Sequence, residues 1–471
     1  MNRLVLILFT VLLAAAVYFS TERILFCDAS YIMLRIINSE WFQIQEYRYG
    51  AAITQAFPFI GVKLNLPISW IIVLYSASFN LFYLAVAAWL VKTGETAMAI
   101  LMSFFFLLLV SDTFFWTNNE IHQAVAWMFL FFSTIFLMAR KNVSRILMIP
   151  VFSLLAFLTL YTHPLIIFSF GFLWFFFMIQ KNIWPFNRKW TIIYSLIILI
   201  ILAARFAVSL YYSRYMYDAA KMQAAIHFSL DDLLHVFDSP MAREFAKRCL
   251  TNYWIMPLLF VSGIISGIRQ KQYRPVLLSA GFALVYFVVM CLTFTDFITY
   301  YSESEWMSFA IIVTAPFVYF TLPKLKPSLA VYLIAGIFLV RLGYIGMASD
   351  KFVQRKEWIY ATLDTMRQKK LSKGIIYETE ETRNILLQNN WSQPSESMIA
   401  SALHDDNPTL TFVVDKPENI RKRMPQNNQM ILDFETGEYK KMNPLYFRFD
   451  TTVSYQLIQP QFVNETSEVL K

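Results

Sequence analysis

The sequence has few charged residues and few glycines. Only 15% of its 471 residues are charged, whereas roughly 25% is usual in soluble proteins. The 12 glycines beside 45 phenylalanines argue against a collagen-like, a disordered or a disulfide-stapled chain. Hydrophobic residues make up 57% of the chain and its mean hydropathy is +0.48. This excess of apolar side chains predicts a protein that sits in a lipid bilayer.

Cysteines and common catalytic motifs are also scarce. Cys27, Cys249 and Cys291 lack the spacing of metal ligands, and we expect unpaired thiols, a Cys27–Cys249 disulfide being the alternative. The glycine-rich phosphate and dinucleotide motifs, HExxH and GxSxG are absent, and no internal repeat is evident. The net charge of +8 comes from basic residues in short loops between apolar segments. That distribution indicates membrane orientation, and we predict no nucleic-acid partner.

Apolar segments long enough to approach the length of a membrane span recur along the chain. A spanning helix needs about 20 mostly apolar residues. Eleven segments are candidates: 4–20, 68–91, 96–112, 121–139, 146–161, 164–180, 190–208, 253–268, 275–293, 307–322 and 328–346. A tight hairpin at His163-Pro164 is expected to separate the fifth from the sixth. The first segment is interpreted as an uncleaved anchor, with a signal peptide as the alternative.

The distribution of charges among the loops predicts an orientation. One set of alternate loops is basic throughout and carries a single acid, Glu95, while the opposite set collects the acids. Because basic loops face the cytoplasm, the N-terminus is predicted inside and the C-terminus outside. We therefore expect a multi-pass integral protein of a bacterial inner or cell membrane, with its C-terminal part extracytoplasmic.

Three long segments fall on the outer side, at 21–67, 209–252 and 347–471. The first is predicted to contain an amphipathic helix from Asp28 to Gln45 that lies along the membrane interface. The composition of the third is that of a soluble domain, with expected helices at 351–371, 380–390 and 394–404 and expected strands at 374–377, 410–414, 430–434 and 446–449. The predicted fold is thus an all-α transmembrane domain at 1–346 followed by a small α/β domain at 347–471.

Acidic residues of three outer loops are predicted to lie at one depth. Asp28 follows the first segment closely, and a short second loop carries Asp112, Glu120 and His122. The fifth outer loop adds Asp296, Tyr300, Tyr301, Glu303 and Glu305. Carboxylates gathered in one cavity would suit general base catalysis and the binding of a divalent cation. The alternative interpretation of each acid is an ordinary solvated loop residue.

Basic residues near the same level are candidates for binding an anionic substrate. Arg205 and Arg341 lie inside apolar segments near their outer ends, and Arg48 belongs to the first loop. A charge at such depth usually faces a partner or a cavity, and arginine can hold a phosphate through two hydrogen bonds. The alternatives are snorkelling of the arginines to the interface and, for His163, a helix-end histidine that bonds a backbone carbonyl.

The whole-chain arrangement resembles the GT-C glycosyltransferases, the membrane enzymes related to protein O-mannosyltransferases and aminoarabinose transferases. The resemblance rests on the anchor segment, the long first outer loop with Cys27-Asp28 and its helix, Arg48 and the Pro58 region, Asn119-Glu120, and the outer C-terminal domain. Many members have two adjacent acids in the first loop, where this chain has Cys27 beside Asp28.

The resemblance implies a reaction and roles for individual residues. Members take a sugar from a polyprenyl-phosphate carrier at the outer membrane face and pass it to an acceptor, here an unknown glycan, lipid or protein. Mapped onto this chain, Asp28 becomes the catalytic carboxylate and Glu120, with His122 nearby, the residue that helps bind a divalent metal. Arg48, Arg205, Arg341, His163, Tyr301 and Glu303 are the expected substrate-binding residues.

Other functions are compatible with a multi-spanning chain. A lipid-linked sugar flippase or transporter would carry charged or broken helices near the bilayer midplane. An O-antigen polymerase or ligase would have one very large outer loop late in the chain. In a non-catalytic scaffold protein, the outer domain would be essential and the outer acids dispensable.

Overall fold

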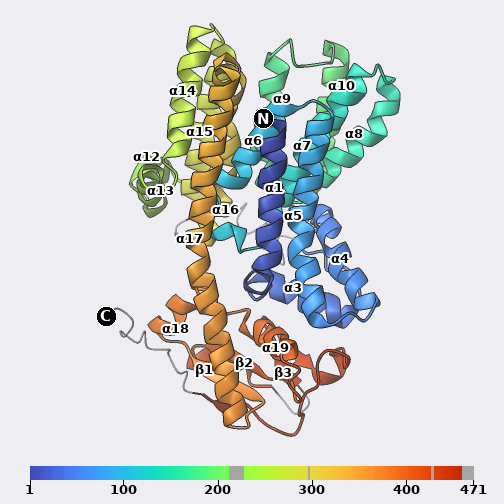
Figure 1. The fold of residues 1–471 in the computed structure, drawn as a ribbon, viewed down its shortest axis with the longest axis vertical. Coiled ribbons are helices and arrows are strands. Elements are labelled where there is room, and N and C mark those ends of the chain that lie inside the picture. The colour runs from blue at the N-terminus through green and yellow to red at the C-terminus, as the bar shows by residue number, and fades with distance from the viewer. Residues whose placement is uncertain (212–227, 295–297, 426–428, 459–471) are drawn as a thin grey trace.

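A computed structural model describes residues 1–211, 228–294, 298–425 and 429–458 (Figure 1). The first half of the second outer segment, predicted at 209–252, falls mostly within 212–227, outside the described residues, and Asp296 of the fifth outer loop also lies outside them. Helices dominate, and a small region of sheet lies at the C-terminal end. The three cysteines are unpaired thiols, as expected.

Each of the eleven predicted apolar segments forms a helix. The helices are α1 (Asn2–Tyr18), α5 (Ile68–Lys92), α6 (Thr96–Leu108), α7 (Glu120–Arg140), α8 (Arg145–Leu160), α9 (Ile166–Ile179), α10 (Arg188–Tyr211), α14 (Ile255–Arg269), α15 (Tyr273–Thr293), α16 (Thr299–Pro316) and α17 (Pro327–Gln368). The break between α8 and α9 falls at His163-Pro164, where a hairpin was predicted. Proline there removes a backbone donor and stops the helix.

Several of these helices are long and apolar enough to cross a membrane. Among the described residues six meet that criterion, or seven if α13 (Pro240–Leu250) and α14, bent by 82°, count as one span. The apolar helices α1, α6, α8 and α9 are shorter, with 10–17 residues each. The structure therefore describes an integral, multi-pass membrane protein, and the number of eleven crossings stays a prediction.

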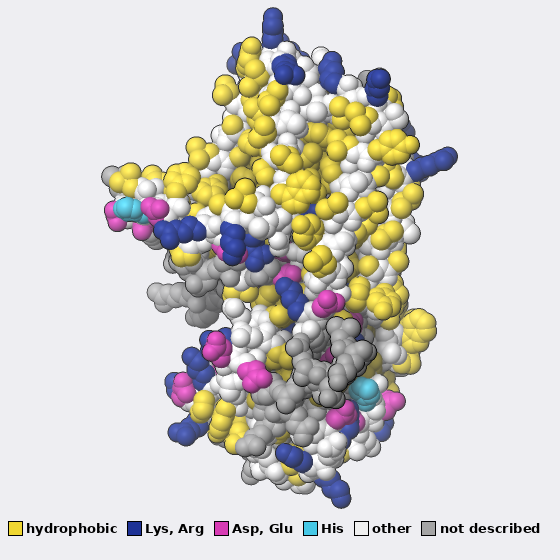
Figure 2. All heavy atoms as spheres, turned by 60° about the vertical axis from the view of Figure 1, so that its left-hand side comes forward, with side chains coloured by type: hydrophobic (Ala, Val, Ile, Leu, Met, Phe, Trp, Pro, Cys, Tyr) yellow, Lys and Arg dark blue, Asp and Glu magenta, His cyan; other side chains and the backbone are white. Residues whose placement is uncertain are grey.

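The surface divides into zones along the long axis of the molecule. Figure 2 shows hydrophobic side chains over the middle of the helical bundle and lysine and arginine side chains beyond them at one end. The opposite end, formed by the C-terminal domain, carries charges of both signs. An apolar zone flanked by polar ends is what a bilayer selects. The basic end matches the loops predicted to face the cytoplasm.

Helix α17 joins the bundle to the C-terminal domain without a break. It has 42 residues and continues past position 346, so the expected domain boundary lies inside one continuous helix. The predicted apolar segment 328–346 and the predicted helix 351–371 are its two halves. A single rigid element therefore links the two parts of the chain.

The C-terminal domain contains a small parallel sheet. Strand β1 (Lys373–Tyr377) lies between β2 (Thr411–Asp415) and β5 (Gln456–Leu457), and a separate hairpin pairs β3 (Gln429–Ile431) with β4 (Thr436–Glu438). Helices α18 (Glu380–Ile385), α19 (Gln393–Leu403) and α20 (Pro417–Arg423) complete it. The predicted strand at 446–449 is wrong, because this segment forms a turn followed by irregular backbone.

The first outer segment is partly helical, and its helices pack against the bundle and the C-terminal domain. It contains α2 (Ser20–Ile24), α3 (Asp28–Ser39) and α4 (Ala52–Lys63). Helix α3 ends earlier than predicted because Glu40 adopts a left-handed conformation with φ of 51°. Its apolar face packs between α4 and α19, so it links the bundle to the C-terminal domain (Figure 1).

Candidate functional site

A pocket of about 1130 Å³ lies where the membrane helices meet the first outer segment and the C-terminal domain. Its wall has three parts. Polar and charged side chains form the first: Asp28, Glu46, Arg48, Asn119, Glu120, His163, Arg205, Tyr301 and Glu305. Apolar side chains of α9, α10 and α15 form the second, and aromatic residues of α3 and the C-terminal domain form the third.

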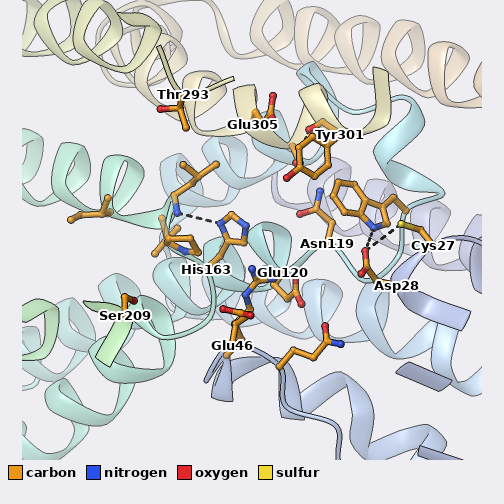
Figure 3. A pocket seen from close by; sticks show the side chains of 18 of the residues that line it. Cys27, Asp28, Glu46, Asn119, Glu120, His163, Ser209, Thr293, Tyr301 and Glu305 are labelled. Atoms are coloured by element: carbon orange, nitrogen blue, oxygen red, sulfur yellow. Dashed lines mark hydrogen bonds and ion pairs between the residues drawn. The ribbon is translucent and has the colours of Figure 1, made fainter. Parts of the chain in front are cut away.

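Asp28 is the first residue of α3 and opens into this pocket (Figure 3). Its carboxylate accepts hydrogen bonds from Trp116 Nε1 at 3.0 Å and from Cys27 Sγ at 3.4 Å. The surrounding protein raises the pKa of Asp28 above its ordinary value, and the bond from Trp116 opposes that shift. A carboxylate with a raised pKa that reaches a cavity is suited to accept a proton.

Cys27, just before Asp28, has a strained backbone. Its φ of 56° and ψ of −136° lie where residues other than glycine are rarely found. The Cys27 N–H donates to Glu396 Oε1 of α19 at 3.0 Å. The fully buried Glu396 also pairs with Arg355 of α17 at 2.6 Å, and Arg355 donates to the Leu25 carbonyl. These contacts with α17 and the C-terminal domain thus fix the backbone at Leu25 and Cys27, which positions Asp28.

Arg48 and Glu120 form an ion pair in the pocket wall, with 2.7 Å between Nη1 and Oε2. Glu120 begins α7, where the positive end of the helix dipole favours a carboxylate. Asn119 caps the same helix through its side-chain oxygen. Its amide nitrogen Nδ2 is buried and has no hydrogen-bond partner among the described residues.

His163, Arg205 and Tyr301, which were expected to bind substrate, also line the pocket. In the turn between α8 and α9, His163 Nδ1 accepts a hydrogen bond from the Leu165 N–H at 3.2 Å. The Arg205 guanidinium of α10 lies 5.4 Å from the centre of the Tyr161 ring. Tyr301 stacks on Trp116 with 5.6 Å between ring centres. In Figure 3, Asp28 and Cys27 lie on one side of the pocket, with Ser209 and Thr293 on the other.

Three predicted site residues do not line the pocket. Glu303 is buried in a hydrogen-bond cluster with Ser111, Thr113 and Tyr253. Arg341 is buried and donates to the backbone carbonyls of Leu107, Val110 and Asn252. His122 packs among the rings of Tyr83, Phe105 and Phe106. Glu303 and Arg341 thus have hydrogen-bond partners inside the bundle, and His122 packs among aromatic rings. The sequence pattern alone does not distinguish such buried residues from residues that line a functional site.

Helix periodicity could have separated the pocket residues from the buried ones. Tyr301 and Glu305 are four residues apart in α16 and face the pocket, whereas Glu303 lies between them on another face. His122 follows Glu120 by two residues and points elsewhere for the same reason. Glu46 and Asn119 were not assigned to the site from the sequence, whereas Glu305 was among the outer-loop acids expected to line a cavity.

The predicted metal site does not fit the side chains as they lie. Glu120 is paired with Arg48, and His122 sits among aromatic rings away from the pocket. In the described part of the chain, no three histidine, cysteine, aspartate or glutamate side chains come together as metal ligands. We therefore derive no step that uses a metal ion at Glu120 and His122.

Comparison with known proteins returned no relatives. No family model matches the chain, and neither a curated protein nor a solved structure matches it. The pocket itself is therefore the basis for assigning a function.

Proposed function

We propose that this protein is a membrane glycosyltransferase that moves a sugar from a polyprenyl-phosphate carrier to an acceptor. The observation that carries the proposal is a single pocket that contains the partly buried Asp28 carboxylate, the arginines Arg48 and Arg205 and an apolar wall. Each part of such a donor has a counterpart there: a sugar beside Asp28, a phosphate near Arg48 and Arg205, and an isoprenoid chain along the apolar wall.

The apolar wall supports a lipid substrate. Its side chains come from the start of α9 and from α10 and α15, and they are Leu165, just before α9, Ile166, Ile167, Phe168, Leu202, Phe206, Val289 and Met290. Helix α10 lies at the outside of the bundle, since only 11% of the residues in its most apolar stretch are buried. A lipid in the bilayer could therefore approach the pocket from the side, without passing through water.

In the proposed reaction, a hydroxyl oxygen of the acceptor attacks the anomeric carbon of the donor sugar. A new carbon–oxygen bond forms as the bond between that carbon and the phosphate oxygen breaks, and polyprenyl phosphate leaves with the bonding electrons. Asp28 accepts the hydroxyl proton. Arg48 and Arg205 stabilise the negative charge on the departing phosphate. The reaction consumes neither a sugar nucleotide nor ATP.

The orientation belongs to the same proposal. The basic end of the molecule would face the cytoplasm, and the pocket and C-terminal domain would face the extracytoplasmic side of a bacterial membrane. That side is where a polyprenyl carrier delivers sugars.

Release of polyprenyl phosphate tests the proposal. Full-length protein in detergent is incubated with undecaprenyl phosphate carrying mannose, glucose, arabinose or N-acetylglucosamine, together with a membrane extract as acceptor source. Mass spectrometry then measures undecaprenyl phosphate. We expect release with at least one donor, and Asp28→Asn should lower it by about 10² or more because a positioned base contributes that much.

Asp231→Asn is the matched control, because Asp231 is an exposed acid of another outer segment. It should release product at the normal rate. Full activity of Asp28→Asn would remove Asp28 from the mechanism. Absence of release with every donor would contradict the proposed function, and it is the result expected of a flippase, which breaks no bond.

A further inference from the structure

The third part of the pocket wall is an aromatic cluster that the proposed reaction does not use. Tyr31 of α3 lies 6.0 Å from the Trp391 ring and 5.5 Å from the Phe434 ring, measured between centres. Trp391 and Phe434 stack on each other with 4.5 Å between centres. All three line the pocket that contains Asp28. We call Tyr31, Trp391 and Phe434 the aromatic platform.

Phe434 is the exposed member of the platform, and its position is fixed by the residues on both sides. Phe434 has 65% of its surface exposed, which is unusual for a phenylalanine in a folded domain. It lies in the turn between β3 and β4, next to the buried Asp433, which accepts a hydrogen bond from the Ser395 N–H at 3.1 Å. Glu435, on its other side, pairs with Arg35 of α3 at 2.8 Å. The ring is therefore presented to solvent by a turn that is fixed on both sides.

Tyr31, the platform residue that belongs to α3, lies on the same face of this helix as Asp28. Asp28, Tyr31 and Arg35 are spaced three and four residues apart, so their side chains lie in a row along the helix. Tyr31 is displaced from Asp28 by about 4.5 Å along the helix axis, from the rise per residue. That displacement is comparable to the width of one sugar ring. A sugar ring held against the platform would lie in the same pocket as the Asp28 carboxylate.

We propose that the aromatic platform binds the acceptor and that the acceptor is a saccharide. This inference rests on the proposed function. The C–H groups on one face of a pyranose carry partial positive charge and are attracted to the negative face of an aromatic ring. The hydroxyl groups at its edge need planar polar partners, and Arg35, Gln43 and Gln45 line the same pocket.

The surroundings favour a saccharide over a peptide or a lipid. A peptide that binds in an extended form needs an open strand edge, and none of the described residues that line the pocket comes from β1, β2 or β5. A lipid chain needs continuous apolar surface, whereas the Arg35–Glu435 ion pair borders the platform. The apolar wall of α9, α10 and α15 is a separate part of the pocket.

Binding to immobilised saccharides tests the inference. Fluorescently labelled full-length protein in detergent is applied to an array of mannotriose, maltotriose, cellotriose and chitotriose, beside an array of unmodified peptides. We expect binding to at least one saccharide and none to the peptides. Trp391→Ala and Phe434→Ala should each weaken saccharide binding by about two- to tenfold, the effect expected for loss of one aromatic contact.

Trp41→Ala is the matched control. Trp41 is 62% exposed and contacts Phe42 and Phe59, and it does not line the pocket. It should bind saccharides like the wild type. Since Phe434 is exposed, Phe434→Ala is expected to fold normally, so unchanged binding by that variant would overturn the inference. Binding to peptides alone, or to nothing on either array, would also overturn it.

The two proposals fail in distinguishable ways. If the platform is wrong and the function is right, undecaprenyl phosphate is still released and the Phe434→Ala variant binds and reacts normally. If the function is wrong and the platform is right, saccharides bind through Phe434 while no polyprenyl donor is cleaved.

Discussion

The Asp28 carboxylate is subject to two opposing effects. Burial raises its pKa, whereas the hydrogen bonds from Trp116 and Cys27 and the nearby Arg48 charge favour the ionised form. If Asp28 accepts a proton in the reaction, activity is present above its pKa and is lost as the pH falls through that value. The acid limb of the pH profile should therefore lie above the ordinary aspartate pKa of about 3.9.

Removal of the Trp116 hydrogen bond should move that limb upward. Trp116→Phe keeps an aromatic ring but removes the N–H group that donates to Asp28. Loss of this hydrogen bond disfavours the ionised carboxylate and so raises the pKa of Asp28. A hydrogen bond to a charged group contributes about 1.5–3 kcal/mol, so we expect the limb of kcat/KM to shift upward by about one to two pH units. The profile of donor cleavage measures this shift.

Trp184→Phe serves as the comparison, because the Trp184 indole donates to Thr191 at 2.8 Å and takes no part in the pocket. Its profile should coincide with that of the wild type. An unchanged acid limb in Trp116→Phe would show that the ionisation of Asp28 does not control the reaction.

Single residues also show what the sequence could and could not predict. Asp28, Arg48, Glu120, His163, Arg205 and Tyr301 were selected from loops and helix ends at one level, and the structure brings them into one pocket. The same reasoning selected Glu303 and Arg341, which are buried among hydrogen-bond partners from distant segments. Depth in a membrane follows from sequence position, but the direction of a side chain depends on packing between helices.

At the level of elements, the pair formed by α17 and α19 positions the start of α3. Arg355 and Glu396 are 1% and 0% exposed, and together they bind the Leu25 carbonyl and the Cys27 N–H. Four donors converge on the Glu396 carboxylate: Cys27 N, Ser392 Oγ, Gln393 Nε2 and Arg355 Nη2. This arrangement maintains the strained Cys27 conformation from outside the pocket.

Glu396→Gln should therefore weaken both the fold and the reaction. The amide nitrogen that replaces one oxygen cannot accept, and Arg355 loses its buried counter-charge, a change that costs about 3 kcal/mol. We expect a lower melting temperature and a kcat for donor cleavage reduced about tenfold or more. The KM for the donor should change little, because Glu396 does not line the pocket.

Glu381→Gln provides the control, as an exposed glutamate of the same domain. It should leave both measurements unchanged. A lower melting temperature with normal kcat in Glu396→Gln would mean that the ion pair stabilises the domain without positioning Asp28.

Elements were predictable to different degrees. The apolar helices follow directly from hydropathy, and β1 and β2 follow from short apolar runs such as Ile375-Ile376 and Val413-Val414. The strand expected at 446–449 failed because its aromatic residues pack against other parts of the molecule without a ladder of backbone hydrogen bonds. Helix α3 ended early at Glu40, whose left-handed backbone has no clear sequence signal.

At the scale of the whole molecule, the pocket lies where three separate parts of the chain meet. The first outer segment supplies Asp28 and Arg48, the bundle supplies Glu120 and Arg205, and the C-terminal domain supplies Trp391 and Phe434. The last contribution was not predictable, because residues more than 350 positions from Asp28 approach it only after α17 has carried the domain back toward α3 (Figure 1).

The central claim is that the pocket holds a polyprenyl-phosphate sugar with its anomeric carbon beside Asp28. A cryo-electron microscopy structure of the Asp28→Asn variant with an uncleaved donor from the release assay tests it most directly. We predict the sugar next to position 28, the phosphate within hydrogen-bond distance of Arg48 or Arg205, and the isoprenoid chain against α9 and α10. A donor bound elsewhere on the bundle, and not in this pocket, would contradict the claim.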